Sequence, residues 1–174
     1  MKHKKDYKEK TLEYYNQNDK AFIDGTLNVD FSETQDKFLS FLNPGDKILD
    51  FGCGSGRDTK YFLEKGFEVT AIDGSKKMCE FASQFTGINI TQLDFLDFYE
   101  KERYNGIWAC SSILHLNSKE LLRVLKNISV ALKPDGIFYT SFKYGTFEGE
   151  RNGRFFNDMT QTKFSELLKK IRSL

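Results

Sequence analysis

The sequence is poor in the residues that metal sites, disulfide frameworks and flexible linkers require. It holds three cysteines, two histidines and two prolines among 174 residues. The cysteines, Cys53, Cys79 and Cys110, are odd in number and form no C-x-x-C pair, which indicates reduced thiols. With His3 and His115 as the only histidines, the sequence predicts no metal site. So few prolines also argue against a disordered chain.

Charge of one sign and long apolar runs are missing as well. The net charge of +1 gives no global basic field, so nucleic acid is not expected as a partner. No apolar run reaches the length of a membrane span, and the basic residues 1–6 are followed by no apolar core of a signal peptide. We expect a soluble, cytoplasmic protein without a membrane partner.

Strands alternate with helices over most of the chain. The residues up to about 43 are predicted to form a helical cap, after a polar arm that ends near Lys10. From residue 44 to residue 174, strands are predicted at 47–51, 67–72, 88–93, 106–111 and 137–142, with helices near 57–65, 75–86, 118–132 and 160–171, and a polar loop at 143–157. This order predicts an α/β fold: a doubly wound, mainly parallel sheet of about five strands with helices on both faces.

The first predicted strand runs into three alternating glycines, Gly52, Gly54 and Gly56. Glycines there leave backbone N–H groups bare and let a ligand approach the main chain. A dinucleotide fingerprint needs a third small residue at a fixed spacing. Counted from Gly52 that position is Arg57, and counted from Gly54 it is Thr59. Neither fits, which disfavours a nicotinamide-dependent reductase.

Polar residues follow the ends of successive strands, where ligands bind in such folds. Asp50 would repel a pyrophosphate but suits an ammonium group. Asp73 is placed to accept hydrogen bonds from ribose hydroxyls, and Asp94, with Phe95 beside it, from an adenine amino group. Ser111 follows the fourth strand. Each aspartate alone is as readily a turn residue, but three in succession indicate a site.

Together these residues resemble the motifs of class I S-adenosylmethionine (SAM)-dependent methyltransferases. The resemblance covers roughly residues 45–142 and rests on 50–57 (Asp-Phe-Gly-Cys-Gly-Ser-Gly-Arg), 69–75 (Val-Thr-Ala-Ile-Asp-Gly-Ser), 93–94 (Leu-Asp) and 132–136 (Leu-Lys-Pro-Asp-Gly). It implies a Rossmann-like methyltransferase fold and SAM as the cofactor, with S-adenosylhomocysteine (SAH) as its product. Arg57-Asp58 and residues 141–145 look most like small bacterial, tellurite-resistance-like methyltransferases.

The resemblance also implies which residues hold the cofactor. Asp50 and the glycines would hold its methionine part, Asp73 its ribose, and Asp94 and Phe95 its adenine. The full predicted cofactor-binding set is Asp50, Gly52, Cys53, Gly54, Gly56, Arg57, Asp73, Gly74, Ser75, Asp94, Phe95, Ser111 and Tyr15.

Residues for the methyl acceptor are harder to predict. His115 is the candidate base, with a packing histidine as the alternative. Tyr14 lies in the segment that this family folds over the cofactor as a lid, with an ordinary core tyrosine as the alternative. Arg151 and Arg154 would grip an anionic acceptor, or would be solvated and paired with neighbouring glutamates at positions 148 and 150.

The sequence departs from the family after the last predicted helix. Members end with strands 6 and 7, whereas no β-rich segment follows Ile171 here. We therefore expect either that the fifth strand is an exposed edge that favours a homodimer, or that the chain is a truncated form of a longer protein. The predicted function is methyl transfer from SAM to a small-molecule acceptor. RNA or protein methylation, and SAM binding without catalysis, are the alternatives.

Overall fold

The computed structural model describes residues 6–172, so the first five residues of the predicted N-terminal arm lie outside it. The rest of that arm, from Tyr7, is helical. The helices are α1 (Tyr7–Gln17), α2 (Asp19–Thr26), α3 (Ser32–Leu39), α4 (Arg57–Glu64), α5 (Lys76–Thr86), α6 (Ser118–Ala131) and α7 (Gln161–Arg172), with short 3₁₀ turns η1 (Phe95–Asp97) and η2 (Ile113–His115). The strands are β1 (Lys47–Phe51), β2 (Glu68–Asp73), β3 (Thr91–Gln92), β4 (Tyr104–Ala109), β5 (Leu132–Thr140), β6 (Glu148–Arg151) and β7 (Arg154–Asn157).

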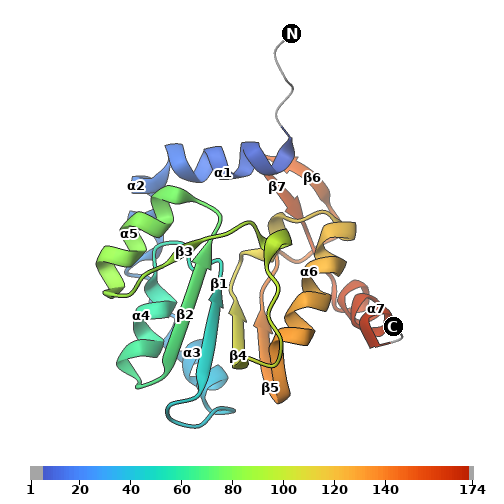
Figure 1. Ribbon diagram of the computed structural model, residues 1–174. Helices are drawn as coiled ribbons and strands as arrows, with labels where there is room; N and C mark the ends of the chain where they lie inside the picture. The colour runs from blue at the N-terminus through green and yellow to red at the C-terminus, as the bar shows by residue number, and fades with distance from the viewer. Residues whose placement is uncertain (1–5, 173–174) are drawn as a thin grey trace.

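Five strands form a parallel sheet in the order β3-β2-β1-β4-β5. The order reverses between β1 and β4, as in doubly wound folds, and α1 lies across the carboxyl ends of the strands (Figure 1). The predicted fold class is confirmed.

Alternate residues of β1 show how both faces of the sheet are covered. Ile48 packs with Phe38 of α3 and Phe62 of α4 on one face. Leu49 packs on the other face, in a cluster that includes Leu121 and Leu125 of α6. Because the strand is buried on both sides, its sequence is a continuous apolar run interrupted only by Asp50.

The predicted loop at 143–157 contains structure that was not expected. Here β6 and β7 pair as an antiparallel hairpin, separate from the main sheet. Arg151 pairs with Arg154, so the turn is Asn152-Gly153, with φ values of 51° and 77°. Asn-Gly is a strong signal for a two-residue hairpin, and the prediction of a loop overlooked it.

Other boundaries differ in detail. β5 begins at Leu132 because it pairs there with Tyr104, and residues 133–136, expected between the helix and the strand, form an irregular stretch of the strand, with Asp135 at φ 63°. β3 is only two residues long. Among the described residues β5 pairs only with β4 in the main sheet and is its edge. Pairing of this edge with a second copy stays a prediction.

Candidate active site

A cavity of about 470 Å³ opens at the carboxyl ends of β1, β2 and β4, within the usual size of small-molecule sites. Helices α1 and α2 form one wall and the sheet forms the other. Of the predicted site residues, the following line the cavity: Tyr15, Gly52, Cys53, Gly54, Arg57, Asp73, Gly74, Asp94, Phe95, Ser111 and His115. Six predicted residues are not part of the lining: Tyr14, Asp50, Gly56, Ser75, Arg151 and Arg154.

The glycine loop, residues 52–56, does not present bare amides as predicted. The N–H groups of Gly52 and Cys53 both donate to the Ile72 carbonyl, at 2.9 and 3.0 Å, and that of Gly54 donates to Asp73 Oδ2 at 2.9 Å. The loop needs glycine because of close approach instead. A Cβ on Gly52, at φ +87°, would lie 2.3 Å from Cβ of Ser112.

Asp50 lies beneath this loop and not in the cavity. It is one residue short of the end of β1, so its side chain points into the face covered by α4, where Thr59 Oγ1 donates to it at 2.6 Å. Burial, and next the negative charge of Asp58, raise the pKa of the Asp50 carboxyl well above its usual range. The Asp50 carboxylate therefore does not reach the cavity, and a ligand there would not contact it.

Asp73 lies at the end of β2 and lines the cavity. Its carboxylate is fixed by two backbone donors, Gly54 N–H at 2.9 Å and Ser75 N–H at 2.8 Å. Burial raises its pKa, and these donors work in the opposite direction. Ser75, predicted to bind the cofactor, instead caps α5 by accepting from Met78 N–H and is not part of the cavity lining.

Asp94 and Phe95 approach the cavity from the other side of the glycine loop. Asp94 caps η1 by accepting from Leu96 N–H at 2.9 Å, and its second oxygen lies 3.7 Å from Lys8 Nζ of α1. The ring centres of Phe95 and Phe51 lie 4.6 Å apart, with the planes tilted by 33°. The Phe95 ring would lie 2.9 Å from a Cβ on Gly52. Asp94 therefore serves both as a turn residue and as part of the cavity wall.

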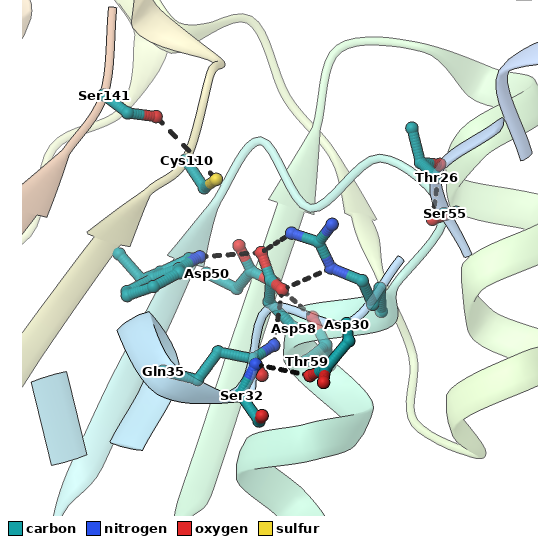
Figure 2. A network of polar contacts seen from close by, with 12 residues as sticks. Thr26, Asp30, Ser32, Gln35, Asp50, Ser55, Asp58, Thr59, Cys110 and Ser141 are labelled. Atoms are coloured by element: carbon teal, nitrogen blue, oxygen red, sulfur yellow. Dashed lines mark hydrogen bonds and ion pairs between the residues drawn. The ribbon is translucent and has the colours of Figure 1, made fainter. Parts of the chain in front are cut away.

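Asp58 is a cavity residue that sequence reasoning missed. Figure 2 shows its carboxylate between donors from different elements. Gln35 Nε2 of α3 donates at 2.7 Å, Trp108 Nε1 of β4 at 2.8 Å, and Arg57 binds through Nε and Nη2 at 2.7 and 3.0 Å. The network holds the Arg57 side chain against Phe31, 4.9 Å from the ring centroid. Gln35 and Trp108 are far from Asp58 in the sequence, so no local signal announces the contact.

His115 and Tyr15 meet at the wall that faces the hairpin. His115 Nδ1 is 2.6 Å from the Phe155 carbonyl, which can only accept, so Nδ1 carries the proton. Nε2 then accepts from the Tyr15 hydroxyl at 2.8 Å. Burial first, and then the charges of Arg154 and Lys143, lower the pKa of His115 to about 4, although the hydrogen bond to Phe155 acts in the opposite direction. The imidazole is neutral at pH 7, with a fixed tautomer.

The two predicted acceptor arginines lie behind this wall. Arg151 forms a two-pronged ion pair with Asp158, at 2.7 and 3.0 Å. The expected partners are taken elsewhere, because Glu150 binds Lys10 and Glu148 binds Ser118. The suggested glutamate pairing is therefore wrong for both arginines.

Arg154 lies above the Tyr14 ring, at 4.4 Å, and donates to the Tyr15 hydroxyl over a long 3.4 Å. Tyr14 is therefore a support for Arg154 and not a wall of the cavity.

Several further residues that line the cavity were not predicted. They come mainly from the helical cap and from the ends of β4 and β5: Lys8, Thr11, Leu12, Phe22, Thr26, Val29, Phe31, Ser55, Met78, Cys110, Ser112, Leu116 and Ser141. The cap has no motif of its own, so its cavity-facing residues could not be told from core residues by pattern.

No helix within residues 6–172 has the length and apolar content to cross a membrane.

Comparison with known proteins finds relatives that are named as methyltransferases. The chain is 36% identical to the putative methyltransferase YqeM of Bacillus subtilis over 109 residues, 56% of this chain and 44% of that protein. It is 33% identical to phosphoethanolamine N-methyltransferase 1 of Zea mays over 127 residues, 68% of this chain and 25% of that protein. The chain thus spans less than half the length of either relative.

A solved structure shares the fold. The 1,6-didemethyltoxoflavin N1-methyltransferase of Burkholderia thailandensis, with bound 1,6-didemethyltoxoflavin and SAH, superimposes with a TM-score of 0.73 at 23% identity, over 92% of this chain and 73% of that one. The family model described as a methyltransferase domain matches residues 48–136, just over half of the 174 residues. With the five-stranded parallel sheet, this match shows that the chain belongs to the class I SAM-dependent methyltransferase domains.

Proposed function

We propose that the protein transfers a methyl group from SAM to a small-molecule acceptor. The observation that carries the proposal is the position of Asp73, a half-buried carboxylate fixed by two backbone donors at the wall of a cavity of about 470 Å³. A carboxylate fixed in this way has lone pairs left for vicinal hydroxyls, the group that a ribose presents.

The other walls fit the rest of the cofactor. Gly54 and Gly74 allow a ligand or the cap to approach the main chain closely. A Cβ on Gly54 would lie 3.1 Å from Phe22, and a Cβ on Gly74 would lie 2.7 Å from Leu12. Asp94 would accept from the adenine amino group while Phe95 covers its ring. The sulfonium of the bound cofactor supplies an activated methyl group, so the protein's work is alignment and exclusion of water.

Residues outside the lining have positioning roles in this proposal. Asp50 acts through Thr59, which fixes the start of α4 beneath the glycine loop. Gly56 begins α4 in a left-handed conformation, φ +82°, against Ala82 and Thr86. Ser75 orders the start of α5. Each would affect cofactor affinity through the shape of the loop and not through contact.

The cap favours a small acceptor over RNA or protein. Leu12, Tyr15 and Phe22 of α1 and α2 line the cavity, so a macromolecule would have to displace both helices to reach it. Two of the matched proteins act, by their names, on small molecules, phosphoethanolamine and 1,6-didemethyltoxoflavin. His115 Nε2 already accepts from the Tyr15 hydroxyl, so in this proposal His115 fixes Tyr15 at the wall that faces the acceptor.

Calorimetry with SAM, SAH and NAD tests the proposal. We expect SAM and SAH to bind and NAD not to bind. Asp73→Asn should lower SAH affinity about tenfold or more, because hydrogen bonds to a charged group contribute about 1.5–3 kcal/mol. Asp135→Asn, at an exposed position in β5 with φ 63°, is the matched control and should bind as the wild type does. Binding of NAD without SAM would overturn the proposal.

Transfer of a tritiated methyl group from SAM separates catalysis from binding alone. We expect label to enter a low-molecular-weight fraction of a metabolite extract. Label only in RNA or protein would replace the small-molecule acceptor with a macromolecular one. SAH binding without label in any fraction would support the non-catalytic alternative.

A further inference from the structure

The wall formed by Tyr15, His115 and the hairpin carries positive charge without a matching carboxylate. Within the described part of the chain, Arg154 has no ion-pair partner, and its Nε is buried without a hydrogen-bond acceptor. Buried, unpaired donors of this kind cost free energy, and a native structure retains them where something else satisfies them.

The acidic residues of the hairpin are already engaged. Glu148 accepts from Ser118, Glu150 binds Lys10, and Asp158 binds Arg151. None is left for Arg154, which donates to the Tyr15 hydroxyl over 3.4 Å. That bond is at the long end of hydrogen-bond distances, so the guanidinium is held mainly by aromatic rings.

A second cation strengthens the positive field at this end of the cavity. Lys143 Nζ lies 5.7 Å from the centre of the Phe156 ring, and the Arg154 guanidinium lies 5.1 Å from the same centre. That ring is 5.0 Å from the ring of His115, which lines the cavity. Both cations therefore act on His115, in agreement with its lowered pKa.

We propose, on the basis of the function proposed above, that the methyl acceptor carries an anionic oxygen group, a carboxylate or a phosphate. This group would bind the Tyr15 hydroxyl at the hairpin end of the cavity, with the positive charge of Arg154 behind that hydroxyl. The hydroxyl can turn its proton from His115 Nε2 toward the anion while its oxygen still accepts from Arg154, which strengthens the hydroxyl as a donor. Arg151 takes no part, because Asp158 already neutralises it.

The test uses inorganic phosphate, benzoate and benzamide as probes, titrated into the SAH-saturated protein and into the protein alone. We expect phosphate and benzoate to bind in the millimolar range or tighter and to shift the NMR signal of the Arg154 Nε–H group. Benzamide has the shape of benzoate without its charge and should leave that signal unchanged. SAH binding, measured first, reports on the proposed function separately from the anion site.

Three variants complete the design. Arg154→Met should weaken benzoate binding about tenfold while SAH affinity is retained, and Arg154→Lys should restore part of the loss because it keeps the charge. Arg103→Met removes an exposed arginine that pairs with Glu100 and should change nothing. Wild-type anion affinity in Arg154→Met, equal binding of benzamide and benzoate, or no anion binding in the millimolar range would each overturn the inference.

Discussion

The two walls of the cavity are held in place by different forces. Strand β1, on the sheet side, has every residue after Lys47 buried, whereas α1 of the cap has Thr11 as its one buried residue and α2 has none. The sheet wall is stabilised by burial of apolar surface on both faces.

Helices α1 and α2 of the cap are attached largely by side-chain hydrogen bonds and ion pairs, whereas α3 packs into the core through Phe38 and Leu39. Tyr15 binds His115, Asn16 binds Ser75, Thr11 binds the backbone of Phe155, and Lys10 binds Glu150. Bonds of this kind each contribute about 1 kcal/mol, and exposed ion pairs less. The sheet wall is therefore a preformed part of the site, while α1 and α2 are expected to open with the lowest free energy.

The largest effect should come from the sheet wall, at Asp58. Asp58→Ala leaves Arg57, Gln35 and Trp108 without their acceptor in a site where the carboxylate is only 10% exposed. We expect a loss of about 3–5 kcal/mol in the free energy of unfolding, measured by urea denaturation. Asp36→Ala breaks an exposed ion pair with Lys65 and an exposed hydrogen bond from the Tyr61 hydroxyl, and should cost about 1 kcal/mol or less. Equal losses in the two variants would contradict this view of the sheet wall.

The next effect concerns the contact between the two walls, at His115. Its pKa is about 4 in the folded protein and 6.5 ordinarily, so between these values the unfolded state binds more protons. This contribution to stability is fully present above pH 6.5 and is lost as the pH falls toward 4, up to about 3 kcal/mol. His115→Gln does not titrate, so its stability relative to the wild type should improve steadily on acidification. A difference that stays constant from pH 7.5 to pH 4.5 would show that His115 is not buried in this way.

A smaller effect separates crowding from backbone strain in the glycine loop. Gly52 and Gly66 both have φ +87°, but a Cβ on Gly52 meets Ser112 at 2.3 Å, whereas one on Gly66 has nothing within 4 Å. Both Gly→Ala variants pay for the left-handed backbone, so their difference measures the crowding. We expect Gly52→Ala to be less stable than Gly66→Ala by about 1–3 kcal/mol in urea denaturation. Equal stability would mean that the loop yields easily.

The smallest effect should appear only in the cap. Tyr15→Phe removes the 2.8 Å bond to His115, worth about 1 kcal/mol, without disturbing the sheet. We expect the amides of α1 to exchange with deuterium about fivefold faster, while those of β1 do not change. Tyr99→Phe, at a side chain that is 71% exposed, is the control. Faster exchange in β1 as well would show that the two walls unfold as one unit.

The same contrast explains how much the sequence predicted. The parallel sheet, the glycine loop and Asp73 follow from strand periodicity and from residue types at strand ends, which are local properties. Asp50 was placed in the cavity although alternation along β1 turns it to the α4 face, a rule that could have been applied. The Asp58 network and the cap contacts join residues far apart in the sequence, and the predicted acceptor arginines depend on pairings that only the tertiary structure decides.

Trp108 has a practical consequence. It is the one tryptophan in the sequence, it is fully buried, it lies 3.9 Å from the Tyr139 ring, and its indole N–H donates to Asp58. Asp58 in turn holds Arg57, which lines the cavity. When it is excited at wavelengths that indole absorbs and the eight tyrosines do not, the protein therefore emits from a single chromophore, joined to the site through two side chains. We expect that emission to give an unlabelled optical signal for ligand arrival, free of background from other indoles.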